Sequence, residues 1–430
     1  MARVGIFGAG WVGLVTGACF AELGHEVVVR DVVPEKIEAL QLGEVPFHEV
    51  DIPELLAGNR ERLTFTLDSA DLADCRFLFV CVDTPPTKSG DADLSRVWSV
   101  VDQLPELSGR AILVMKSTVP VGTGEKIRHG LDERGLHDIG YVSNPEFLAE
   151  GTAVRDFMHP DRIAIGAFEP ADGDAVAELY AKVEGPILRY GVNSAEMIKL
   201  ASNAALMTRI SFINEIANVC EKTGADVVEV AEGIGYDKRL GPHFLRAGIG
   251  YGGSCFPKDS LALKQLASNS GYHFQLLAAV IEVNDLQKRR VIGKLEAHLG
   301  PLRGKKIALL GLAFKPDTDD MREAPSIVLA GRLIAEGAEV RAWDPVADGA
   351  ALPRGVEIVP TVADAVRGAD AAVIVTEWKE LKGLASPETH AAMANPLIID
   401  GRNLLDPRTV REAGFTYEGI GRASAANGSG

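Results

Sequence analysis

The stretch Val4–Gly13, VGIFGAGWVG, decides the fold, because an apolar strand pattern runs into a helical pattern through three spaced glycines. In this G-x-G-x-x-G arrangement Gly8 allows a tight turn, Gly10 lets the backbone approach a pyrophosphate, and Gly13 allows the helix to pack closely on the strand. The N-terminus of the helix then faces the phosphates. The stretch therefore predicts a dinucleotide-binding turn followed by a helix over 12–23.

An acidic residue ends the second strand-like run, EVVVRD over 26–31. A carboxylate at this place, Asp31, hydrogen-bonds a ribose 2′-hydroxyl and repels a 2′-phosphate, so NAD is preferred over NADP. Arg30 and Lys36 carry positive charge nearby, which leaves the NADP alternative open.

Apolar runs alternate with helical patterns through the first part of the chain. Further strands are expected over 76–82, 111–118 and 139–145. These runs are continuously apolar, which is typical of a parallel sheet covered on both faces. Strands separated by helices predict a doubly wound α/β domain, an NAD-binding Rossmann domain over 1–192.

A single long amphipathic helix is expected next. Asn193 and Glu196 have the spacing of a helix N-terminal capping box, and apolar residues then recur every three or four positions up to Cys220. Helical patterns continue to about His298, which predicts a helical region over 193–300. Periodicity alone leaves open whether the long helix forms a subunit interface or part of a buried core.

The alternation of strands and helices then returns. Strands are expected over 305–314, 338–345, 371–378 and 396–400, with a helix over 326–337. This pattern predicts a second Rossmann-like domain over 301–423, although only Gly311 follows its first strand. Residues 424–430 have the composition of a disordered tail.

Composition and charge exclude several classes of protein. Lys+Arg number 44 against 60 Asp+Glu, and the net charge of −16 argues against nucleic acid or a membrane surface as partner. Five cysteines without a C-x-x-C pair predict neither a disulfide framework nor a metal site, and favour a reducing, cytoplasmic location. No run is apolar enough for a membrane span, and the glycines of the first helix argue against a signal peptide.

The segment Gly250–Asp259, GYGGSCFPKD, places a cysteine on a glycine-rich loop just before a helix expected to begin near Pro257. Cys255 would meet unpaired N–H groups, the helix dipole and Lys258 there, and all three favour a reactive thiolate. Asp259 lies four residues on, where it could act as a base or position a water. The alternative is a small buried hydrophobe, an interpretation that suits Cys19, Cys75, Cys81 and Cys220.

Two further pairs of polar residues are candidates on weaker signals. Lys199 and Asn203 are four apart on the expected long helix and share a face, for which a solvated surface is the alternative. Glu146 and Glu150 follow a strand end, where open α/β sheets bind ligands, and a carboxylate pair at a helix start is the alternative.

With the cysteine segment, motifs along nearly the whole chain resemble the UDP-glucose/GDP-mannose dehydrogenase family. Besides the glycine turn, the matching motifs are Thr84-Pro85, KSTVPVGT (116–123), NPEFL (144–148), PDR (160–162), EMIKL (196–200) with Asn203, GLAFK (311–315) and DGR (400–402). The resemblance implies two Rossmann-like doubly wound domains joined by a long central helix and a helical dimerisation region. It also implies that a nucleotide sugar is oxidised twice at C6, from alcohol to carboxylate, with two NAD.

The same resemblance implies roles for particular residues. Cys255 would carry a thiohemiacetal and then a thioester, while Lys199 and Asn203 stabilise the oxyanions. Asp259 and Lys199 would manage protons, and Glu146 and Thr118 would position the hydrolytic water, with Glu146 as base. The residues implied to bind the cofactor are Gly8, Gly10, Val12, Gly13, Asp31, Lys36, Thr84, Thr118, Glu150 and Arg322.

The implied substrate positions are Phe147, Leu148, Lys199, Asn203, Phe244, Tyr251, Gly252, Phe314, Lys315 and Arg402, together with Arg239, which family members donate across a homodimer. Lys315 and Arg402 would meet the diphosphate and uridine. FLRAG (244–248) and Phe256 resemble the branch that acts on UDP-glucose, whereas Ser254 and Lys258 argue against the N-acetylhexosamine branches. The GDP-mannose branch is excluded less firmly and stays as an alternative.

Two other functions compete with this interpretation. A β-hydroxyacid dehydrogenase shares the first domain and a lysine–asparagine helix, but needs neither Cys255 nor the second Rossmann-like domain. A nucleotide-sugar sensor without turnover predicts a gap among the catalytic residues, and none is missing among Cys255, Lys199, Asp259, Glu146 and Thr118.

Overall fold

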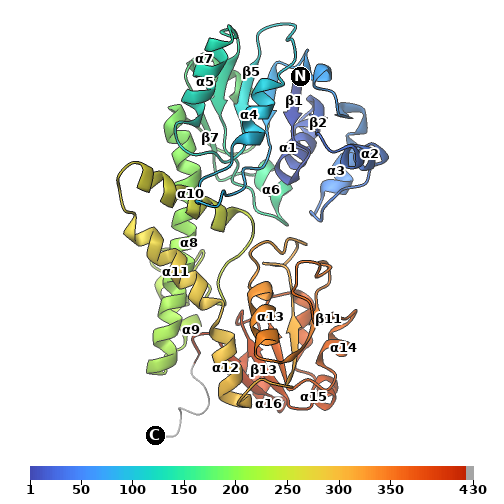
Figure 1. The fold of residues 1–430 in the computed structure, drawn as a ribbon, viewed down its shortest axis with the longest axis vertical. Helices are drawn as coiled ribbons and strands as arrows, with labels where there is room; N and C mark the ends of the chain where they lie inside the picture. Colours follow the sequence, from blue (N-terminus) through green and yellow to red (C-terminus); the bar gives the residue numbers. More distant parts are fainter. Residues whose placement is uncertain (423–430) are drawn as a thin grey trace. The chain divides into compact units, whose positions relative to one another are not determined.

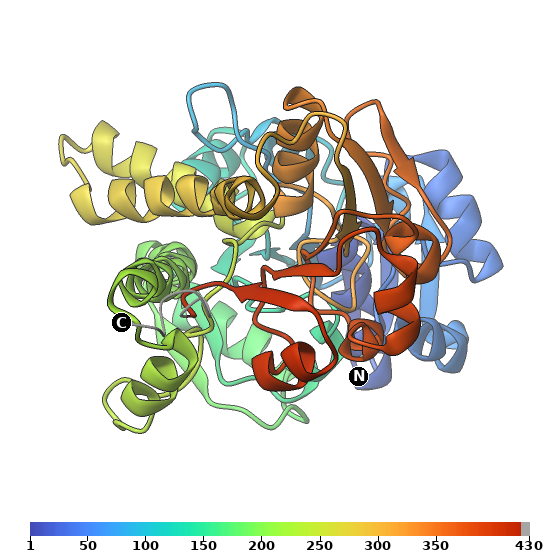
Figure 2. The same cartoon turned by 90° about the horizontal axis from the view of Figure 1, so that it is seen from below.

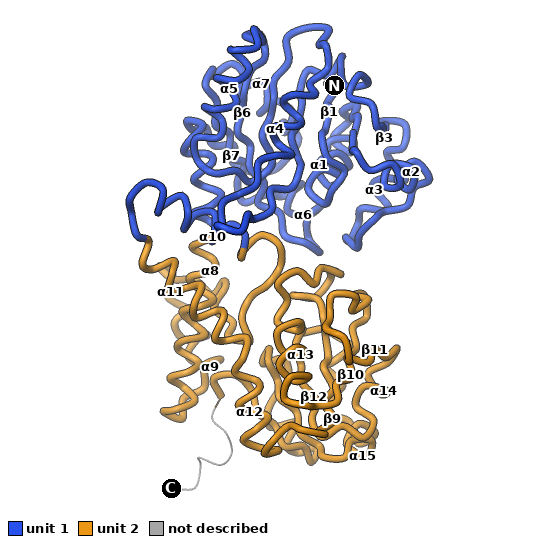
Figure 3. Tube along the Cα trace, viewed as in Figure 1, with its two compact units in different colours: residues 1–202, 258–273 blue, residues 203–257, 274–430 orange. Residues whose placement is uncertain are grey.

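The computed structural model describes residues 1–422, so the predicted disordered tail over 424–430 lies outside the described residues. The chain divides into two compact units, which are coloured separately in Figure 3. The first unit comprises residues 1–202 and 258–273, and the second comprises residues 203–257 and those from 274 onward. Each unit contains one β-sheet.

Eight strands form the sheet of the first unit, in the order β3-β2-β1-β4-β5-β6-β7-β8. The strands are β1 (Arg3–Phe7), β2 (Glu26–Arg30), β3 (Leu63–Thr66), β4 (Phe77–Val80), β5 (Ile112–Met115), β6 (Gly140–Ser143), β7 (Ile163–Ala167) and β8 (Ile187–Tyr190). Strands β4, β5 and β6 are buried at every residue, as their apolar runs predict. All neighbours from β3 to β6 are parallel, and this strand order is that of a doubly wound Rossmann domain.

Seven helices and two 3-10 turns connect these strands. They are α1 (Trp11–Glu22), α2 (Pro34–Leu42), α3 (Ile52–Gly58), α4 (Ser95–Asp102), α5 (Thr123–Glu133), α6 (Ala153–Met158) and α7 (Pro170–Leu179), with the turns Arg60–Arg62 and Ser69–Leu72. Figure 1 shows α1 packed against β1 and β2, so the glycine turn between β1 and α1 lies at the middle of the sheet.

The sheet departs from the sequence prediction on one side. Strand β7 runs antiparallel to β6, with Val142 opposite Ala167, so the sheet is not purely parallel. Strands β3, β7 and β8 are missing from the prediction. Strands β3 and β8 form the two edges and are only partly buried, so neither carries a continuous apolar run. Strand β7 is mostly buried, but its five residues include Gly166 and two alanines, which weaken the strand pattern.

Helix α8 (Val192–Thr223) has 32 residues and is the long helix that the periodicity predicts. Its start differs from the prediction, because the Asn193 side chain donates to Glu125 and forms no capping box with Glu196. The Glu196 carboxylate accepts the N–H groups of Gly122 and Gly124 instead, both at 2.8 Å. Glu196 therefore caps the neighbouring helix α5, whose positive end favours a carboxylate.

Four more helices follow, as predicted up to about His298: α9 (Val227–Gly235), α10 (Cys255–Asn269), α11 (Gln275–Gln287) and α12 (Arg290–Leu299). Helix α10 begins at Cys255 itself, two residues before the predicted start near Pro257. Proline is tolerated there because the first N–H groups of a helix have no intrahelical partner. Within residues 1–422, no helix combines the length and the apolar character that crossing a bilayer requires.

Six strands form the sheet of the second unit, in the order β11-β10-β9-β12-β13-β14. They are β9 (Lys306–Leu310), β10 (Glu339–Trp343), β11 (Val356–Ile358), β12 (Ala371–Ile374), β13 (Leu397–Asp400) and β14 (Thr416–Gly419). The connecting elements are α13 (Pro325–Ala335), α14 (Val362–Val366), the 3-10 turn Lys379–Gly383, α15 (Pro387–Ala392) and α16 (Pro407–Glu412). All five pairings are parallel, and Figure 2 shows these orange-to-red strands lying between helices of the same unit.

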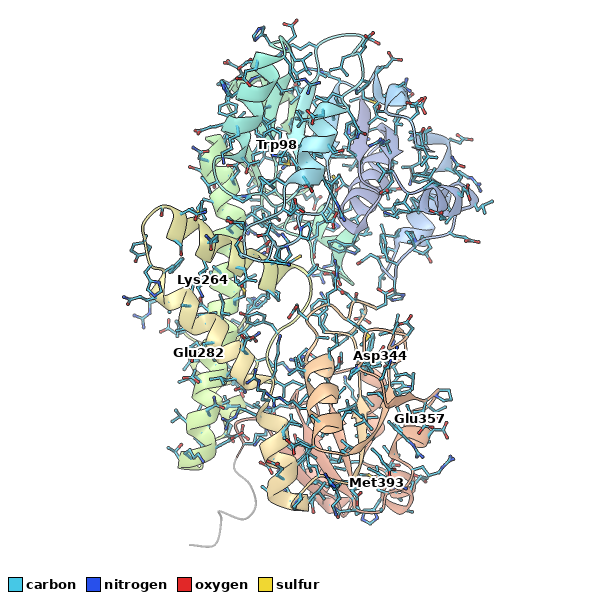
Figure 4. All side chains as sticks on the ribbon, in the orientation of Figure 1. Trp98, Lys264, Glu282, Asp344, Glu357 and Met393 are labelled. Atoms are coloured by element: carbon cyan, nitrogen blue, oxygen red, sulfur yellow. The ribbon has the colours of Figure 1, made fainter. Side chains whose placement is uncertain are left out.

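The turn after β9, the first strand of this second sheet, is closely packed against neighbouring residues. Asp344, labelled in Figure 4, follows β10 and accepts the N–H of Leu312 at 2.6 Å and the indole N–H of Trp378 at 2.9 Å. A Cβ atom on Gly311 would lie 2.4 Å from the Cβ of Thr376. This turn carries Gly311 but not the second and third glycines of the G-x-G-x-x-G arrangement, so it lacks the full dinucleotide-binding signature.

Candidate active site

The glycine turn of the first unit has the geometry that a dinucleotide requires. Gly8 has a φ of +103°, which favours glycine, and its N–H donates to the Arg30 carbonyl at 2.8 Å. A Cβ on Gly13 would lie 1.8 Å from the Gly8 carbonyl oxygen, so only glycine lets α1 pack this closely. Beside Gly10, by contrast, no atom lies within 4 Å of such a Cβ. The turn therefore leaves open space where a pyrophosphate would approach.

Asp31 lies directly after β2 and is 7% exposed. Its Oδ2 accepts the Ala9 N–H at 2.7 Å and lies 3.0 Å from the Lys36 Nζ. Burial raises the pKa of the Asp31 carboxyl, but the hydrogen bonds from Lys36 and Ala9 outweigh burial and lower it below its usual value. Arg30 donates to the Leu67 carbonyl and to Gln103. An ionised carboxylate at this position fits the ribose of NAD.

Two alanine substitutions separate folding from cofactor binding at this turn. Gly10→Ala is expected to keep the melting temperature, because Gly10 has a φ of −77° and space for a methyl group. Its affinity for NAD should fall at least about tenfold, since the methyl group occupies the space left for the pyrophosphate. Gly13→Ala should lower the free energy of unfolding by about 3 kcal/mol or more through overpacking. Thermal melting and NAD titration of both variants check this, and an unchanged NAD affinity for Gly10→Ala would contradict it.

A hydrogen-bonded series in the first unit links Thr118, Thr84 and, through Lys258, Asp259. The buried Thr84 hydroxyl donates to the Thr118 carbonyl at 2.8 Å, and Lys258 reaches the same hydroxyl at 3.4 Å. The Lys258 ammonium also lies 2.6 Å from the Asp259 carboxylate, which is 1% exposed. This series of contacts connects the first turn of α10 to the loops after β4 and β5.

A buried ion pair joins Glu146 and Lys199. Glu146 Oε1 lies 2.7 Å from Lys199 Nζ, both side chains are 5% exposed, and Glu146 Oε2 accepts the Leu148 N–H at 2.7 Å. Burial raises the pKa of the Glu146 carboxyl, but the Lys199 ammonium outweighs it, with smaller contributions from the Leu148 N–H and Lys116, so the pKa lies below its usual value. A solvated face for Lys199 is therefore wrong. No helix starts at Glu146, because α6 begins only at Ala153.

Two cations lie close to the ring of Phe147. The Arg162 guanidinium carbon is 3.8 Å from the ring centroid and the Lys199 Nζ is 5.6 Å from it. Arg162 belongs to the PDR motif but is absent from the residues that the sequence interpretation singled out for the site. Phe147 and Leu148 are half-buried and directly follow Glu146. Because the Leu148 N–H donates to Glu146, their backbone lies beside the Glu146–Lys199 pair.

Glu49 is a residue of this region that sequence reasoning misses. Its carboxylate is 3% exposed and accepts the Trp11 indole N–H at 2.7 Å and the Gly151 N–H at 2.8 Å. It thereby ties the glycine turn to the loop that carries Glu150. No periodicity or motif marks a single acid in a loop, so its role emerges only from contacts more than 35 residues away in sequence.

The cysteine segment belongs to the second unit up to Pro257 and is tightly held there. Cys255 is half-buried, in contrast to the buried Cys19, Cys75, Cys81 and Cys220, and its Sγ lies 3.7 Å from the Ser254 hydroxyl. A Cβ on Gly252 would lie 2.4 Å from the Glu323 carbonyl oxygen. The Asn284 side chain accepts the N–H and donates to the carbonyl of Tyr251. These contacts fix the loop that presents Cys255 at the start of α10.

Arg402 also holds this loop. Its guanidinium is 14% exposed and donates to the carbonyl groups of Val375 at 2.8 Å, Gly250 at 3.0 Å and Phe314 at 3.4 Å. Lys315 lies beside the Phe314 ring, with its Nζ 5.6 Å from the centroid. Of the basic residues that the sequence assigns to the substrate, Arg402 and Lys315 therefore lie around the loop before Cys255.

The remaining candidates are more scattered. Asn203 is buried on α8, one turn beyond Lys199. Phe244 is 42% exposed and has a φ of +60°, a strained conformation for an aromatic residue. Arg322 and Arg239 are exposed and bind Asp320 and Asp237, which lie two residues before them.

Metal chemistry has no matching ligand set in the described part of the chain. Between residues 1 and 422 there is no group of three or more His, Cys, Asp or Glu side chains that could hold a metal ion.

Comparison with known proteins identifies the family. Three profiles of the UDP-glucose/GDP-mannose dehydrogenase family match the chain: its NAD binding domain over residues 2–184, its central domain over 193–286 and its UDP binding domain over 308–407. A UDP-glucose 6-dehydrogenase of Pseudomonas aeruginosa is 46% identical over 99% of this chain and 98% of its own length. The UDP-glucose 6-dehydrogenase TuaD of Bacillus subtilis is 42% identical, over 98% of this chain and 94% of its own length.

A solved structure shares the fold. The UDP-glucose dehydrogenase from the archaeon Pyrobaculum islandicum superposes with a TM-score of 0.91 at 36% identity, covering 98% of both chains. The predicted fold class and the predicted cofactor, NAD, are confirmed. This chain belongs to the UDP-glucose/GDP-mannose dehydrogenase family and is an NAD-dependent oxidoreductase.

Proposed function

We propose that the chain oxidises UDP-glucose to UDP-glucuronate with two NAD⁺, through covalent intermediates on Cys255. The observation that carries this proposal is the position of Cys255 as the first residue of α10, on a loop held by buried side chains. The positive end of the helix favours a thiolate there, and a fixed loop limits the geometry of its attack. The UDP-glucose 6-dehydrogenases that share 42–46% identity support the choice of substrate.

The proposed chemistry has three stages. Oxidation of the C6 alcohol gives an aldehyde, the Cys255 thiolate adds to it, and loss of a second hydride turns the thiohemiacetal into a thioester. Water then releases the carboxylate and regenerates the thiol. NAD⁺ supplies the hydride acceptor for each of the two oxidations. Glu146, with Thr118, orients and deprotonates the hydrolytic water, and Asp259 and Lys199 move protons through a water.

In this proposal, two side chains of α8 stabilise the negative charge that forms during the reaction. The Lys199 ammonium, with the Asn203 amide, stabilises the oxyanions that form at C6. The buried pair with Glu146 holds Lys199 in one position, which lowers the reorganisation that the oxyanion would otherwise require. On the cofactor side we assign Glu150 to NAD and Arg322 to its nicotinamide end.

The nucleotide sugar is proposed to contact residues that follow Glu146 in the first unit and residues of the second unit. These are Phe147, Leu148, Phe244, Tyr251, Gly252, Phe314, Lys315 and Arg402. Steady-state assays with UDP-glucose and GDP-mannose side by side test the assignment, with turnover expected for UDP-glucose. Turnover of GDP-mannose alone would keep the mechanism and replace the substrate.

We also propose a cytoplasmic homodimer, in which Arg239 reaches the partner's site. Helix α8 exposes Phe212 and Val219 by 51% and 57%, and they lie seven residues apart on one face. The Arg239 side chain is 88% exposed. Sedimentation velocity should find a dimer for the native chain and a monomer for Phe212→Glu, because a buried carboxylate opposes association. A native monomer at micromolar concentration would contradict the proposal.

A further inference from the structure

Glu49 is a buried acid that the proposed chemistry does not use. It lies between α2 and α3 and is 3% exposed. Three N–H donors meet its carboxylate: the Trp11 indole at 2.7 Å, the Gly151 backbone at 2.8 Å and the Ala153 backbone at 3.1 Å. Burying a carboxylate is unfavourable unless hydrogen bonds compensate for the lost water, so these three bonds account for its place in the fold.

The two oxygens of this carboxylate have different partners. Oε1 accepts the Ala153 N–H, at the first residue of α6, and Oε2 accepts both the Gly151 N–H and the Trp11 indole. The two backbone donors lie more than 100 residues further along the chain. Because each oxygen is held by a backbone group, the carboxylate is a fixed acceptor for the indole.

Trp11 occupies a special place at the glycine turn. It directly follows Gly10 and is the first residue of α1, whose N-terminal N–H groups face a bound pyrophosphate. Its partly buried side chain packs against the core on one side of the first sheet. A tryptophan side chain has two rotatable torsions, and the bond to Glu49 selects one orientation of the indole.

We propose that Glu49 is a positioning residue for NAD, which holds the Trp11 indole in one orientation and so pre-organises the start of α1 for the pyrophosphate. The inference concerns the binding of NAD alone, so it does not depend on the chemistry proposed for Cys255. Its physical content is that a side chain ordered before the cofactor arrives does not have to be ordered during binding.

Two substitutions remove this hydrogen bond in different ways. Glu49→Gln replaces one carboxylate oxygen by an amide NH₂, so a single oxygen remains for donors that now use two. Trp11→Phe is milder, because it keeps an aromatic side chain and leaves Glu49 with both backbone donors. Trp11→Phe is therefore expected to fold, and it serves as the test by itself if Glu49→Gln does not.

Calorimetric titration of the full chain with NAD and, separately, with UDP tests the proposal. The dissociation constant for NAD should rise about fivefold in Trp11→Phe and about tenfold in Glu49→Gln, the cost of ordering one freed side chain. The dissociation constant for UDP should change less than about twofold, because the family's UDP binding domain matches residues 308–407. A general loss of structure would weaken both ligands.

Matched controls use the same substitutions elsewhere in the first unit. Glu54→Gln lies on the exposed side of α3, five residues from Glu49. Trp98→Phe lies on α4, where Trp98, labelled in Figure 4, packs against a different core cluster. Both controls should keep the native affinity for NAD within about twofold.

A double-mutant cycle shows whether the indole acts through the carboxylate. In a Glu49→Gln background, Trp11→Phe should weaken NAD binding by less than about a further twofold, because the bond between the two side chains is already absent. Losses that simply multiply would overturn the proposal, since Trp11 and Glu49 would then act on NAD independently. Native NAD affinity in Trp11→Phe would overturn it as well.

Discussion

Replacing Cys255 with alanine is expected to lower kcat for complete oxidation by about 10³-fold or more, as loss of a catalytic nucleophile does. Without the thiol no thiohemiacetal forms, so the second hydride has no covalent donor and no thioester can be hydrolysed. Cys255→Ser should also lower kcat for complete oxidation, because an alcohol is a far weaker nucleophile than a thiolate at neutral pH. Counting NADH per UDP-glucose and analysing the intact protein by mass spectrometry measure both effects.

Cys220→Ala is the matched control for this variant. Cys220 belongs to the same unit, is buried on α8 and takes no part in the proposed chemistry. It should keep kcat within about a factor of three, because removing one buried sulfur atom lowers stability without changing a group that reacts in the proposed chemistry. Full two-step turnover by Cys255→Ala would remove the covalent mechanism.

Glu146→Gln should slow hydrolysis by about 10²–10⁴-fold, the range for loss of a general base. The carboxylate takes no direct part in the two oxidations, although it holds Lys199, so the variant is expected to form two NADH per subunit faster than it hydrolyses the thioester and then to stall at that intermediate. Rapid-quench mass spectrometry should detect the sugar nucleotide bound to Cys255. A variant that hydrolyses at the native rate, or that stalls before any NADH is formed, would contradict the role of Glu146.

The same substitution should also destabilise the fold. It leaves the Lys199 ammonium buried opposite a neutral amide, and breaking one side of a buried pair costs about 3–5 kcal/mol. Glu133→Gln, on the exposed side of α5, is the control and should change the free energy of unfolding by less than about 0.5 kcal/mol.

The pH dependence of that stability difference has a defined sign. Because the pKa of Glu146 in the folded protein lies below its usual 4.5, the ion pair contributes fully above about pH 4.5. Its contribution is lost as the pH falls through the lowered folded value. Chemical denaturation of the native chain and Glu146→Gln should therefore give curves that converge on acidification.

Local motifs were predictable because a few contiguous residues determine them. The glycine turn needs only a strand, three glycines and a helix, and the structure places Gly8, Gly10 and Gly13 accordingly. The cysteine loop is of the same kind, although α10 starts at Cys255 and not near Pro257. Boundaries of this sort depend on backbone hydrogen bonds that residue types alone do not specify.

Long-range partners were not predictable from the same patterns. Glu196 has the spacing of a capping box with Asn193, yet it caps α5, more than 70 residues away in sequence. A lysine on a helix is normally solvated, so the burial of Lys199 against Glu146 follows only from the packing of α8 on the sheet. Glu49 carries no such signal until its distant partners are known.

The most direct test of the account is the number of NADH formed per UDP-glucose consumed at completion by the native chain. Two NADH per UDP-glucose are expected, with UDP-glucuronate as the product and no free aldehyde. One NADH per UDP-glucose, with the aldehyde released, would contradict the account and leave Cys255 without its proposed role.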